Sequence, residues 1–506
     1  MTARIVRRLR LLGLLSLVLV SALPLQTGAA AQSSGAQPSI GADFYSGLKW
    51  RNIGPFHGGR ISGVGGAIGQ PGVFYAATPQ GGIWKTTSAG VTWFPIFDQV
   101  QNIDSVGAVQ VAPSDSNIVY AGSGDPIGGS NGDGMYKSTD AGKTWTHIGL
   151  EDTTKIPKIV IDPKDPSIVL VCALGDATHK GGGVYRTTDG GATWQSVLKP
   201  DGVPGTRDLA HAFDMPNVVF AATQAPAPAP GAGGGQGRGA AAPAAFAKLF
   251  KSTDEGKTWN EITTLPHYPG RISVAVAMHT NGQRVYVVGN AIENGSGVYR
   301  SDDGGATWKH VGNGEARVSN GQGSYSSGVW VDPENPDIVY VVSIPLYRSI
   351  DGGNTFTSFK GAPGGEDYHV MWIDPTNGQR IAVGADQGAT VTLDGGRTWS
   401  LWYPMPIAQV YHVETNAQYP YWVFAAQQDT GAVMTRSRGD FGQINFNDWR
   451  PVAASEFGTI TADPLHPEIL YAEGYGPGQG GGTLIKINTA TGQSGNVAPN
   501  FGTDAQ

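Results

Sequence analysis

Cysteine is almost absent from this chain, because Cys172 is the only one among the 506 residues. No internal disulfide is available, so the fold must be held together without covalent cross-links. Cys172 lies in the apolar run SIVLVCALG, where we expect a buried and inert thiol. The chain has a net charge of −7, and no cluster of Lys and Arg follows residue 31. A negatively charged surface repels phosphate backbones, so we expect no nucleic-acid partner.

Long apolar segments are also missing, apart from LLGLLSLVLV at residues 11–20. This run follows MTARIVRRLR, which has four arginines and no acid, and it precedes the small residues of TGAAAQ. The order is typical of a secretory signal peptide over residues 1–31, which predicts cleavage after Ala31 and export to the periplasm or the extracellular space. The Arg7-Arg8 pair leaves twin-arginine export open. Beyond residue 31, 30 basic residues stand against 41 acidic ones, and no run reaches the roughly 18 apolar residues that a membrane span needs.

Glycine, in contrast, is abundant, with 75 residues and no Gly-X-Y period. Many of these glycines belong to one recurring phrase. Its copies are KTTSAGVTW (85–93), KSTDAGKTW (137–145), RTTDGGATW (186–194), KSTDEGKTW (251–259), RSDDGGATW (300–308), RSIDGGNTF (348–356) and VTLDGGRTW (391–399). Their closing aromatic residues lie 43 to 65 residues apart, which is the range of propeller blades. The longest interval contains the Ala-, Pro- and Gly-rich segment 225–245, which predicts a flexible surface insertion.

Each repeat places its apolar segments in the same order. In the second repeat these are VGAVQV (106–111), NIVYAGSG (117–124), GMYKS (134–138) and TWTHIGL (144–150). Four short strands separated by turn signals predict a four-stranded antiparallel blade, and hence an all-β propeller with seven blades in residues 44–403.

Residues 404–506 contain two degenerate units, at 421–440 and 464–488. They predict the start of a second, incomplete propeller after a closed seven-bladed ring, with one larger ring as the alternative. The segment LKWRNIGPF (48–56) resembles a stray fourth strand, which we expect to close the ring by pairing with the last blade.

The recurring phrase has a mechanical interpretation. Its aspartate carboxylate can accept backbone N–H groups across a turn, its glycine suits a positive φ, and its aromatic residue can pack between sheets. The phrase resembles the Asp-box repeat of sialidases, sortilin-type receptors and xyloglucan hydrolases, in which the box is structural. We therefore expect a scaffold role for Asp140, Asp189, Asp254, Asp303, Asp351 and Asp394, while Ser88 takes this position in the first box.

Ionisable residues gather where the turns of a propeller surround its central opening. These candidates are His57, Arg60, Asp125, Asp176, Arg271, His369, Asp386, His412, Asp429 and Glu456. Aspartate is common in turns, so a satisfied turn residue is the simpler interpretation of each. Three aromatic residues near the opening either stack on sugar rings or pack between blades, namely Trp402, Tyr403 and Tyr411.

Three segments resemble xyloglucan hydrolases more closely: RNIGPFHGGRISGVGG (51–66), FYAATPQGGIWKT (74–86) and YPYWVFAAQQDTGAVM (419–434). Those enzymes set two seven-bladed propellers face to face and use two aspartates as acid and base. The resemblance implies that Asp429 is one of the pair. The other position is Pro79, which cannot transfer a proton, so the second carboxyl falls to Asp386 or Glu456.

Two functions are compatible with this sequence. We predict a scaffold that binds a glycan or a protein without turnover, because Pro79 replaces a carboxyl that the enzyme needs, and the alternative is a hydrolase of β-glucans. A sialidase would use the charges of Arg60, Arg207 and Arg271, but its Phe-Arg-Ile-Pro signature is absent. The stretch SNGDGM lacks the other spaced oxygen ligands of a calcium loop, and no His/Cys spacing suits zinc, so we predict no metal site and no cofactor. The sequence does not specify an oligomeric state.

Overall fold

A computed structural model gives the structure of the chain and describes residues 41–499, apart from residues 102, 128, 227–244, 292–294, 313–317, 319–324, 326, 362–365 and 476–480. The expected signal peptide lies outside the described residues, as does nearly all of the expected insertion at 225–245. The chain divides into two compact units, Met1–Asn52 and Ile53–Gln506. The described part of the first unit contains a short 3₁₀ helix, η1 (Ala42–Tyr45). Within the described ranges, no helix is both long and apolar enough to span a membrane.

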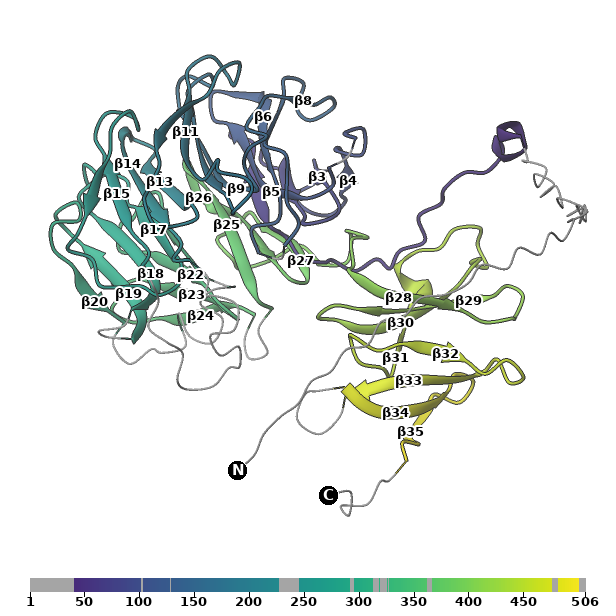
Figure 1. Cartoon of the computed structure of the whole chain (residues 1–506). Coiled ribbons are helices and arrows are strands. Elements are labelled where there is room, and N and C mark those ends of the chain that lie inside the picture. Colours follow the sequence, from purple (N-terminus) through teal and green to yellow (C-terminus); the bar gives the residue numbers. More distant parts are fainter. Residues whose placement is uncertain are drawn as a thin grey trace, which may run out of the picture. The chain divides into compact units, whose positions relative to one another are not determined.

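Nine antiparallel sheets make up the second unit, and within the described residues eight have four strands while one has three (Figure 1). The first sheet comprises β1 (Gly63–Gly66), β2 (Phe74–Ala77), β3 (Ile83–Thr86) and β4 (Phe94–Pro95). The second comprises β5 (Val106–Ala112), β6 (Asp115–Ser123), β7 (Met135–Ser138) and β8 (Thr146–His147). The third comprises β9 (Lys155–Ile161), β10 (Val169–Leu174), β11 (Gly183–Thr187) and β12 (Gln195–Leu198). The fourth comprises β13 (Thr206–Ala212), β14 (Met215–Thr223), β15 (Leu249–Ser252) and β16 (Asn260–Ile262).

The remaining sheets follow the same strand order along the chain. The fifth comprises β17 (Ile272–Val276), β18 (Val285–Ala291), β19 (Gly295–Ser301) and β20 (Lys309–Val311). The sixth comprises β21 (Gly328–Val331), β22 (Val339–Val342), β23 (Leu346–Ser349) and β24 (Thr357–Lys360), and the seventh β25 (Tyr368–Asp374), β26 (Asn377–Ala385) and β27 (Gly388–Thr392). The eighth comprises β28 (Val410–Thr415), β29 (Trp422–Gln427), β30 (Gly431–Arg436) and β31 (Arg450–Val452), with the 3₁₀ helix η3 (Phe446–Asp448) before its last strand. The ninth comprises β32 (Ile460–Ala462), β33 (Ile469–Tyr475), β34 (Gly481–Asn488) and β35 (Gln493–Asn496).

The first seven sheets form a closed ring, so the prediction of an all-β propeller is confirmed. The innermost strands β1, β5, β9, β13, β17, β21 and β25 contact one another in this order, and β25 returns to β1. All seven line one central cavity of about 260 Å³. These contacts favour a seven-membered ring over one larger ring. The eighth and ninth sheets pack on each other through β28 and β32, around a separate apolar cluster that includes Phe424 and Leu470.

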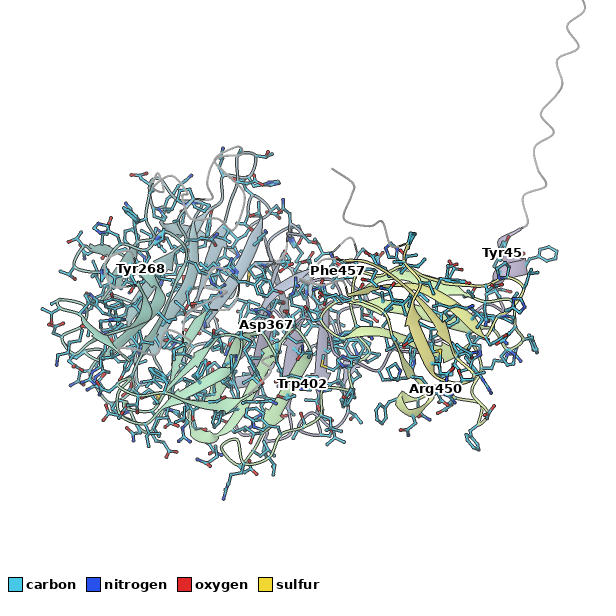
Figure 2. All side chains as sticks on the ribbon, turned by 90° about the horizontal axis from the view of Figure 1, so that it is seen from below. Tyr45, Tyr268, Asp367, Trp402, Arg450 and Phe457 are labelled. Carbon is cyan, nitrogen blue, oxygen red and sulfur yellow. The ribbon has the colours of Figure 1, made fainter. Side chains whose placement is uncertain are left out.

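Apolar side chains between neighbouring sheets form the core. The largest fully buried ones are aromatic, such as Tyr268, which lies in the cluster shared by the fourth and fifth sheets (Figure 2). Cys172 is also fully buried, in β10, and burial raises the pKa of its thiol. This agrees with the inert thiol that the sequence predicts.

The Asp-box turns have the geometry that the sequence predicts. In the second blade, Oδ1 of Asp140 accepts the backbone N–H of Thr144 at 2.9 Å, and Oδ2 accepts the Thr144 hydroxyl at 2.7 Å. Gly142 follows at φ +91°, and Nε1 of Trp145 donates to the carbonyl of Ile96 in the previous blade at 2.8 Å. The other five aspartates bond to their own threonines in the same way: Asp189, Asp254, Asp303, Asp351 and Asp394. These contacts support a scaffold role for the box.

The ring closes through contacts between the first and seventh blades and not through a shared strand, and the N–H of Ile61 donates to the Ala385 carbonyl at 3.1 Å. We expected residues 48–56 to add a fourth strand to the last blade, but no strand forms there and the seventh sheet keeps three. Pro55 has no N–H for a ladder, and Gly54 has φ +91°, which is not extended. Instead, the buried Arg380 of β26 donates to four carbonyls of the first blade, those of Ala67, Gln70, Pro71 and Val73.

Candidate functional site

Asp386 is the centre of a buried polar cluster at one end of the ring. It occupies the tight turn between β26 and β27, and its side chain is 2% exposed. Its Oδ1 lies 3.0 Å from Nε of Arg60 and 2.7 Å from Nε2 of His369. The hydroxyl of Tyr325 donates to the same carboxylate at 3.0 Å. The fold thus brings Arg60 of the first blade to His369 and Asp386 of the seventh.

The cluster holds Asp386 in its charged form. Burial acts to raise the pKa of this carboxyl, but the hydrogen bonds and charges of His369 and Arg60 outweigh burial and keep the pKa below its usual range. The guanidinium of Arg60 also lies over the Tyr325 ring, 5.2 Å from its centroid. A carboxylate that is buried, ionised and bonded on both oxygens has little freedom to exchange a proton.

Tyr325 is a member of the cluster that the sequence analysis missed. It lies in the stretch GQGSYSSG, which reads only as a Gly- and Ser-rich loop before the sixth sheet. The only sequence feature that could have indicated a site residue here is that Tyr325 is the one aromatic residue in a segment of mostly small residues. Its backbone carbonyl also accepts Nη2 of Arg271 at 2.8 Å, so Arg271 reaches the cluster through the main chain of Tyr325.

Asp429 has the opposite electrostatic setting. It lies in the turn between β29 and β30 with φ +61°, and Nε2 of Gln428 donates to its Oδ1 at 2.8 Å. Its Oδ2 is buried and has no hydrogen-bond partner among the described residues. Burial, followed by the negative charges of Asp386 and Glu456, raises the pKa of Asp429 to about 6. This carboxyl therefore retains a proton well above the usual range for aspartate.

Glu456 lies beside the same turn. Its Oε2 accepts the backbone N–H of Asp429 at 2.6 Å, and its side chain is only partly buried. The two carboxyls that the sequence proposed as partners of Asp429 therefore differ. Asp386 is locked in an ionised cluster, whereas Glu456 supports the turn that carries Asp429.

A cavity of about 630 Å³ lies next to Arg60. Pro79 and Gln80 of the first blade line it on one side, and Gln409 and Val410 line it where the chain enters β28. The resemblance places the missing family carboxyl at Pro79, on the wall of this cavity. Arg60 lines the cavity, and its positive charge acts to lower the pKa of Asp429. It therefore lies near both the cavity and the Asp429 carboxyl.

The other predicted residues fall into different places. Every residue of β28 is exposed to some extent. The Tyr411 hydroxyl in this strand donates to Gln428. Desolvation raises the pKa of Tyr411, and the negative charges of Glu456 and Asp429 raise it further. His412 follows in the same strand, and its side chain has no hydrogen bond or ion pair within the described part of the chain. Nδ1 of His57 lies 3.0 Å from the Gly58 carbonyl, and its ring meets Tyr403 edge-on at 5.2 Å. Neither histidine joins the Asp386 cluster.

Two remaining predictions concern aromatic residues and metals. Trp402 packs against the apolar cluster of the sixth and seventh sheets (Figure 2). The Nζ atom of Lys360 lies 4.6 Å from the centroid of its ring. Trp402 therefore packs between blades, which is one of the two roles expected for it. No group of three or more His, Cys, Asp or Glu side chains in the described ranges is arranged to hold a metal ion.

Comparison with known proteins defines the class of this fold. A model of the BNR/Asp-box repeat matches residues 299–310, which contain Asp303 and Trp308. The GH74 xyloglucanase from Xanthomonas campestris has the same fold, with a TM-score of 0.55 and 16% identity over 88% of this chain and 81% of that one. The chain thus contains the BNR/Asp-box repeat and has the β-propeller fold.

The curated relatives are named xyloglucanases. One from a Paenibacillus species is 31% identical over 151 residues, which is 25% of this chain and 14% of the relative. One from Acetivibrio thermocellus is 26% identical over 349 residues, which is 61% of this chain and 39% of the relative. The chain therefore resembles xyloglucanases, while it spans well under half the length of these two.

Proposed function

We propose that this protein is a glycoside hydrolase that acts on β-glucans of the xyloglucan type. The observation that supports this most strongly is the state of Asp429, a carboxyl with a raised pKa and a partnerless, buried oxygen. A general acid must hold its proton at working pH and release it to the leaving oxygen of the glycosidic bond. The position that corresponds to a family catalytic aspartate is occupied by the residue with these properties.

In this proposal Asp429 donates the proton, and Glu456 is the second carboxyl. Glu456 is the better partner because it is partly exposed and lies beside the Asp429 turn. Asp386 acts as a positioning residue, since its buried carboxylate is committed to Arg60, His369 and Tyr325. Tyr411 lies on the exposed strand beside these carboxyls and offers a ring for stacking on a sugar.

The second candidate is a glycan-binding scaffold without turnover. Pro79 favours it, because a proline stands where the resemblance implies one of the two catalytic carboxyls. Both functions use the same glycan surface and differ only in whether a bond is cleaved. We also propose that the protein works outside the cytoplasm, on the basis of the apolar and Arg-rich segment at residues 1–31.

The test compares the full chain with the variants Asp429→Asn, Glu456→Gln and Asp440→Asn. Each is incubated with xyloglucan oligosaccharides, and products are read by mass spectrometry. We expect cleavage by the wild type and by Asp440→Asn, which changes an exposed residue, and loss of cleavage in the other two variants. The wild-type rate should fall as the pH rises through about 6, where Asp429 loses its proton. Saturable binding by a folded wild type without any product would instead select the scaffold.

A further inference from the structure

Two arginines at one end of the ring's central opening form no ion pair among the described residues, although the charge of Asp208 acts on both and that of Asp125 acts on Arg207. Arg207 begins the innermost strand of the fourth sheet, and Arg271 directly precedes that of the fifth. No carboxylate lies within ion-pair distance of either guanidinium in the described part of the chain. Nη1 of Arg207 donates to the Pro126 carbonyl at 2.5 Å, and Nη2 of Arg271 donates to the carbonyls of Tyr325 and Ser327 at 2.8 and 2.9 Å.

Their electrostatic state is unfavourable without a further partner. The Arg271 side chain is buried, and its Nε has no hydrogen-bond partner among the described residues. Burial lowers the pKa of Arg271 and the positive charge of Arg207 lowers it further, while the negative charge of Asp208 offsets only part of this. Buried charges in proteins are normally paired, because removing an unpaired charge from water is costly. An unpartnered donor on a buried cation therefore points to an anionic ligand.

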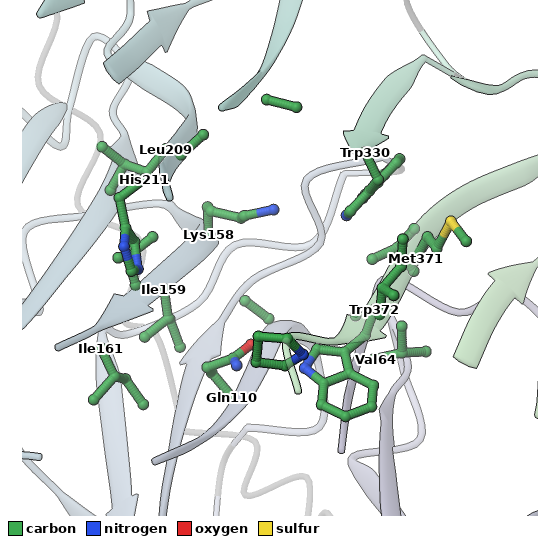
Figure 3. A pocket seen from close by; sticks show the side chains of 18 of the residues that line it. Val64, Gln110, Lys158, Ile159, Ile161, Leu209, His211, Trp330, Met371 and Trp372 are labelled. Atoms are coloured by element: carbon green, nitrogen blue, oxygen red, sulfur yellow. The ribbon is translucent and has the colours of Figure 1, made fainter. Parts of the chain in front are cut away.

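Both arginines line the same small cavity, of about 80 Å³. Lys158 lines it as well, and its side chain reaches into the adjoining central cavity opposite Trp330 (Figure 3). The cavity wall thus carries three cations against one carboxylate, that of Asp208. Asp208 is already occupied, because it accepts the Ser273 hydroxyl at 2.5 Å and the Val274 N–H at 3.1 Å and lies 3.5 Å from Lys158.

We propose that this cavity is an oxyanion-binding site, which takes the carboxylate of a small acidic ligand such as a sugar acid. The chain as a whole has a net charge of −7, so this local excess of positive charge is not a general property of its surface. The Nε–H of Arg271 is available to donate to a ligand. The volume admits a few water-sized groups, which is the size of a carboxylate, so the rest of the ligand stays at the mouth. The paired N–H groups of a guanidinium match a carboxylate in shape and charge. The cavity does not include Asp429 or Glu456, but it borders the Asp386 cluster, because His369 lines it and bonds to Asp386.

The test measures binding of glucuronate to the full chain by isothermal titration calorimetry, with glucose as the neutral match and inorganic sulfate as the free oxyanion. We expect saturable glucuronate binding that weakens with added salt, and no binding of glucose. Lys158→Gln should weaken glucuronate binding at least tenfold, because it removes one of the three cations of the cavity. The variant should still fold, since this side chain is partly exposed and the buried arginines stay in place. Lys143→Gln, which changes an exposed Asp-box lysine, should bind as the wild type does.

Further variants separate this inference from the hydrolytic one. Arg271→Gln tests the orphaned donor directly, with circular dichroism as the check that the variant folds, and Lys158→Gln carries the test if it does not. Asp429→Asn should bind glucuronate normally even where it abolishes hydrolysis. Equal binding of sulfate would support the oxyanion site and identify a free anion as its ligand. Equal binding of glucose, or unchanged binding in Lys158→Gln, would overturn the proposal.

Discussion

Arg60 and Asp386 are 326 positions apart in the sequence, yet Nε of Arg60 lies 3.0 Å from Oδ1 of Asp386. Arg60 precedes the innermost strand of the first sheet, and Asp386 follows the second strand of the seventh, so the pair joins the two ends of the ring. The same carboxylate is the strongest charged influence on Asp429, whose pKa it raises. The ring closure and the proposed acid are therefore electrostatically connected.

Asp386→Asn should lower the pKa of Asp429 from its value of about 6, because the substitution removes a nearby negative charge. It should also destabilise the fold by about 3 kcal/mol, since Arg60 loses the partner of a buried ion pair. Titration of the labelled carboxyl carbons by NMR measures the first effect, and urea unfolding measures the second. The matched control is Asp176→Asn in an exposed turn, and an Asp429 pKa that stays at about 6 would contradict a positioning role.

Asp429→Asn should increase stability at neutral pH. The folded-state pKa of about 6 exceeds the usual value of 3.8, so the folded protein binds this proton more tightly than the unfolded chain does. Below a pH of about 4 both states are protonated and the substitution changes little. As the pH rises to about 6 the wild type loses stability, and above it the loss is complete at about 1–2 kcal/mol, a figure reduced for solvent screening of a partly exposed group.

Urea unfolding at three pH values checks this dependence. The gain of Asp429→Asn over the wild type should be absent at acidic pH and full at mildly basic pH. Asp440→Asn, at a side chain that is 77% exposed, should show no such pH dependence. A gain of equal size at every pH would indicate a packing effect and not the removal of a buried charge.

Much of the fold could be predicted from the sequence because its signals are local. Each Asp-box carries its own turn, since Asp140 bonds to Thr144 only four residues away. The apolar runs around the boxes define strands, and the spacing of the boxes defines blades. A closed ring was predicted, but its mode of closure was not, because it depends on Arg380 of the seventh blade donating to carbonyls of Ala67 and Val73 in the first, a contact that no short motif encodes.

The candidate site was predictable in part for the same reason. Arg60, His369 and Asp386 each occupy a turn or strand start that propeller geometry brings toward the centre. Tyr325 was missed because its loop has no periodic pattern. The distinct states of Asp386 and Asp429 also lay beyond the sequence, because burial and neighbouring charges set them. Both residues read simply as aspartates in turns.

The first Asp-box offers a reciprocal test of the scaffold role. There the Ser88 hydroxyl accepts the Thr92 N–H at 3.0 Å, where other blades use two carboxylate oxygens. Ser88→Asp should stabilise the protein by about 0.5 kcal/mol, and Asp140→Ser should destabilise it by about 1 kcal/mol, as expected for hydrogen bonds that cap a turn. Thermal unfolding measures both changes. Opposite signs are required, and a loss of stability in both variants would count against equivalent roles for the two positions.

Arg380 provides the most demanding test of how the ring closes. Its guanidinium donates to four carbonyls of the first blade and to Asp374 at 2.8 Å, and its side chain is 3% exposed. It also lies over the Phe74 ring, 4.2 Å from the centroid, so it packs as well as bonds. Arg380→Met keeps most of the volume but leaves these carbonyls and the carboxylate of Asp374 without their donor.

Removing one partner from a buried ion pair costs about 3–5 kcal/mol, so Arg380→Met should lower the free energy of unfolding by this amount. Arg397→Met is the matched control, because Arg397 is exposed and donates to one carbonyl only; it should change stability by less than about 0.5 kcal/mol. Hydrogen exchange adds the location of the effect. Faster exchange in β1, β2 and β26 than in the fourth and fifth sheets would place the loss at the closure. Uniform exchange across all seven sheets would mean that the ring opens only as a whole, and that Arg380 stabilises it without acting as a local clasp.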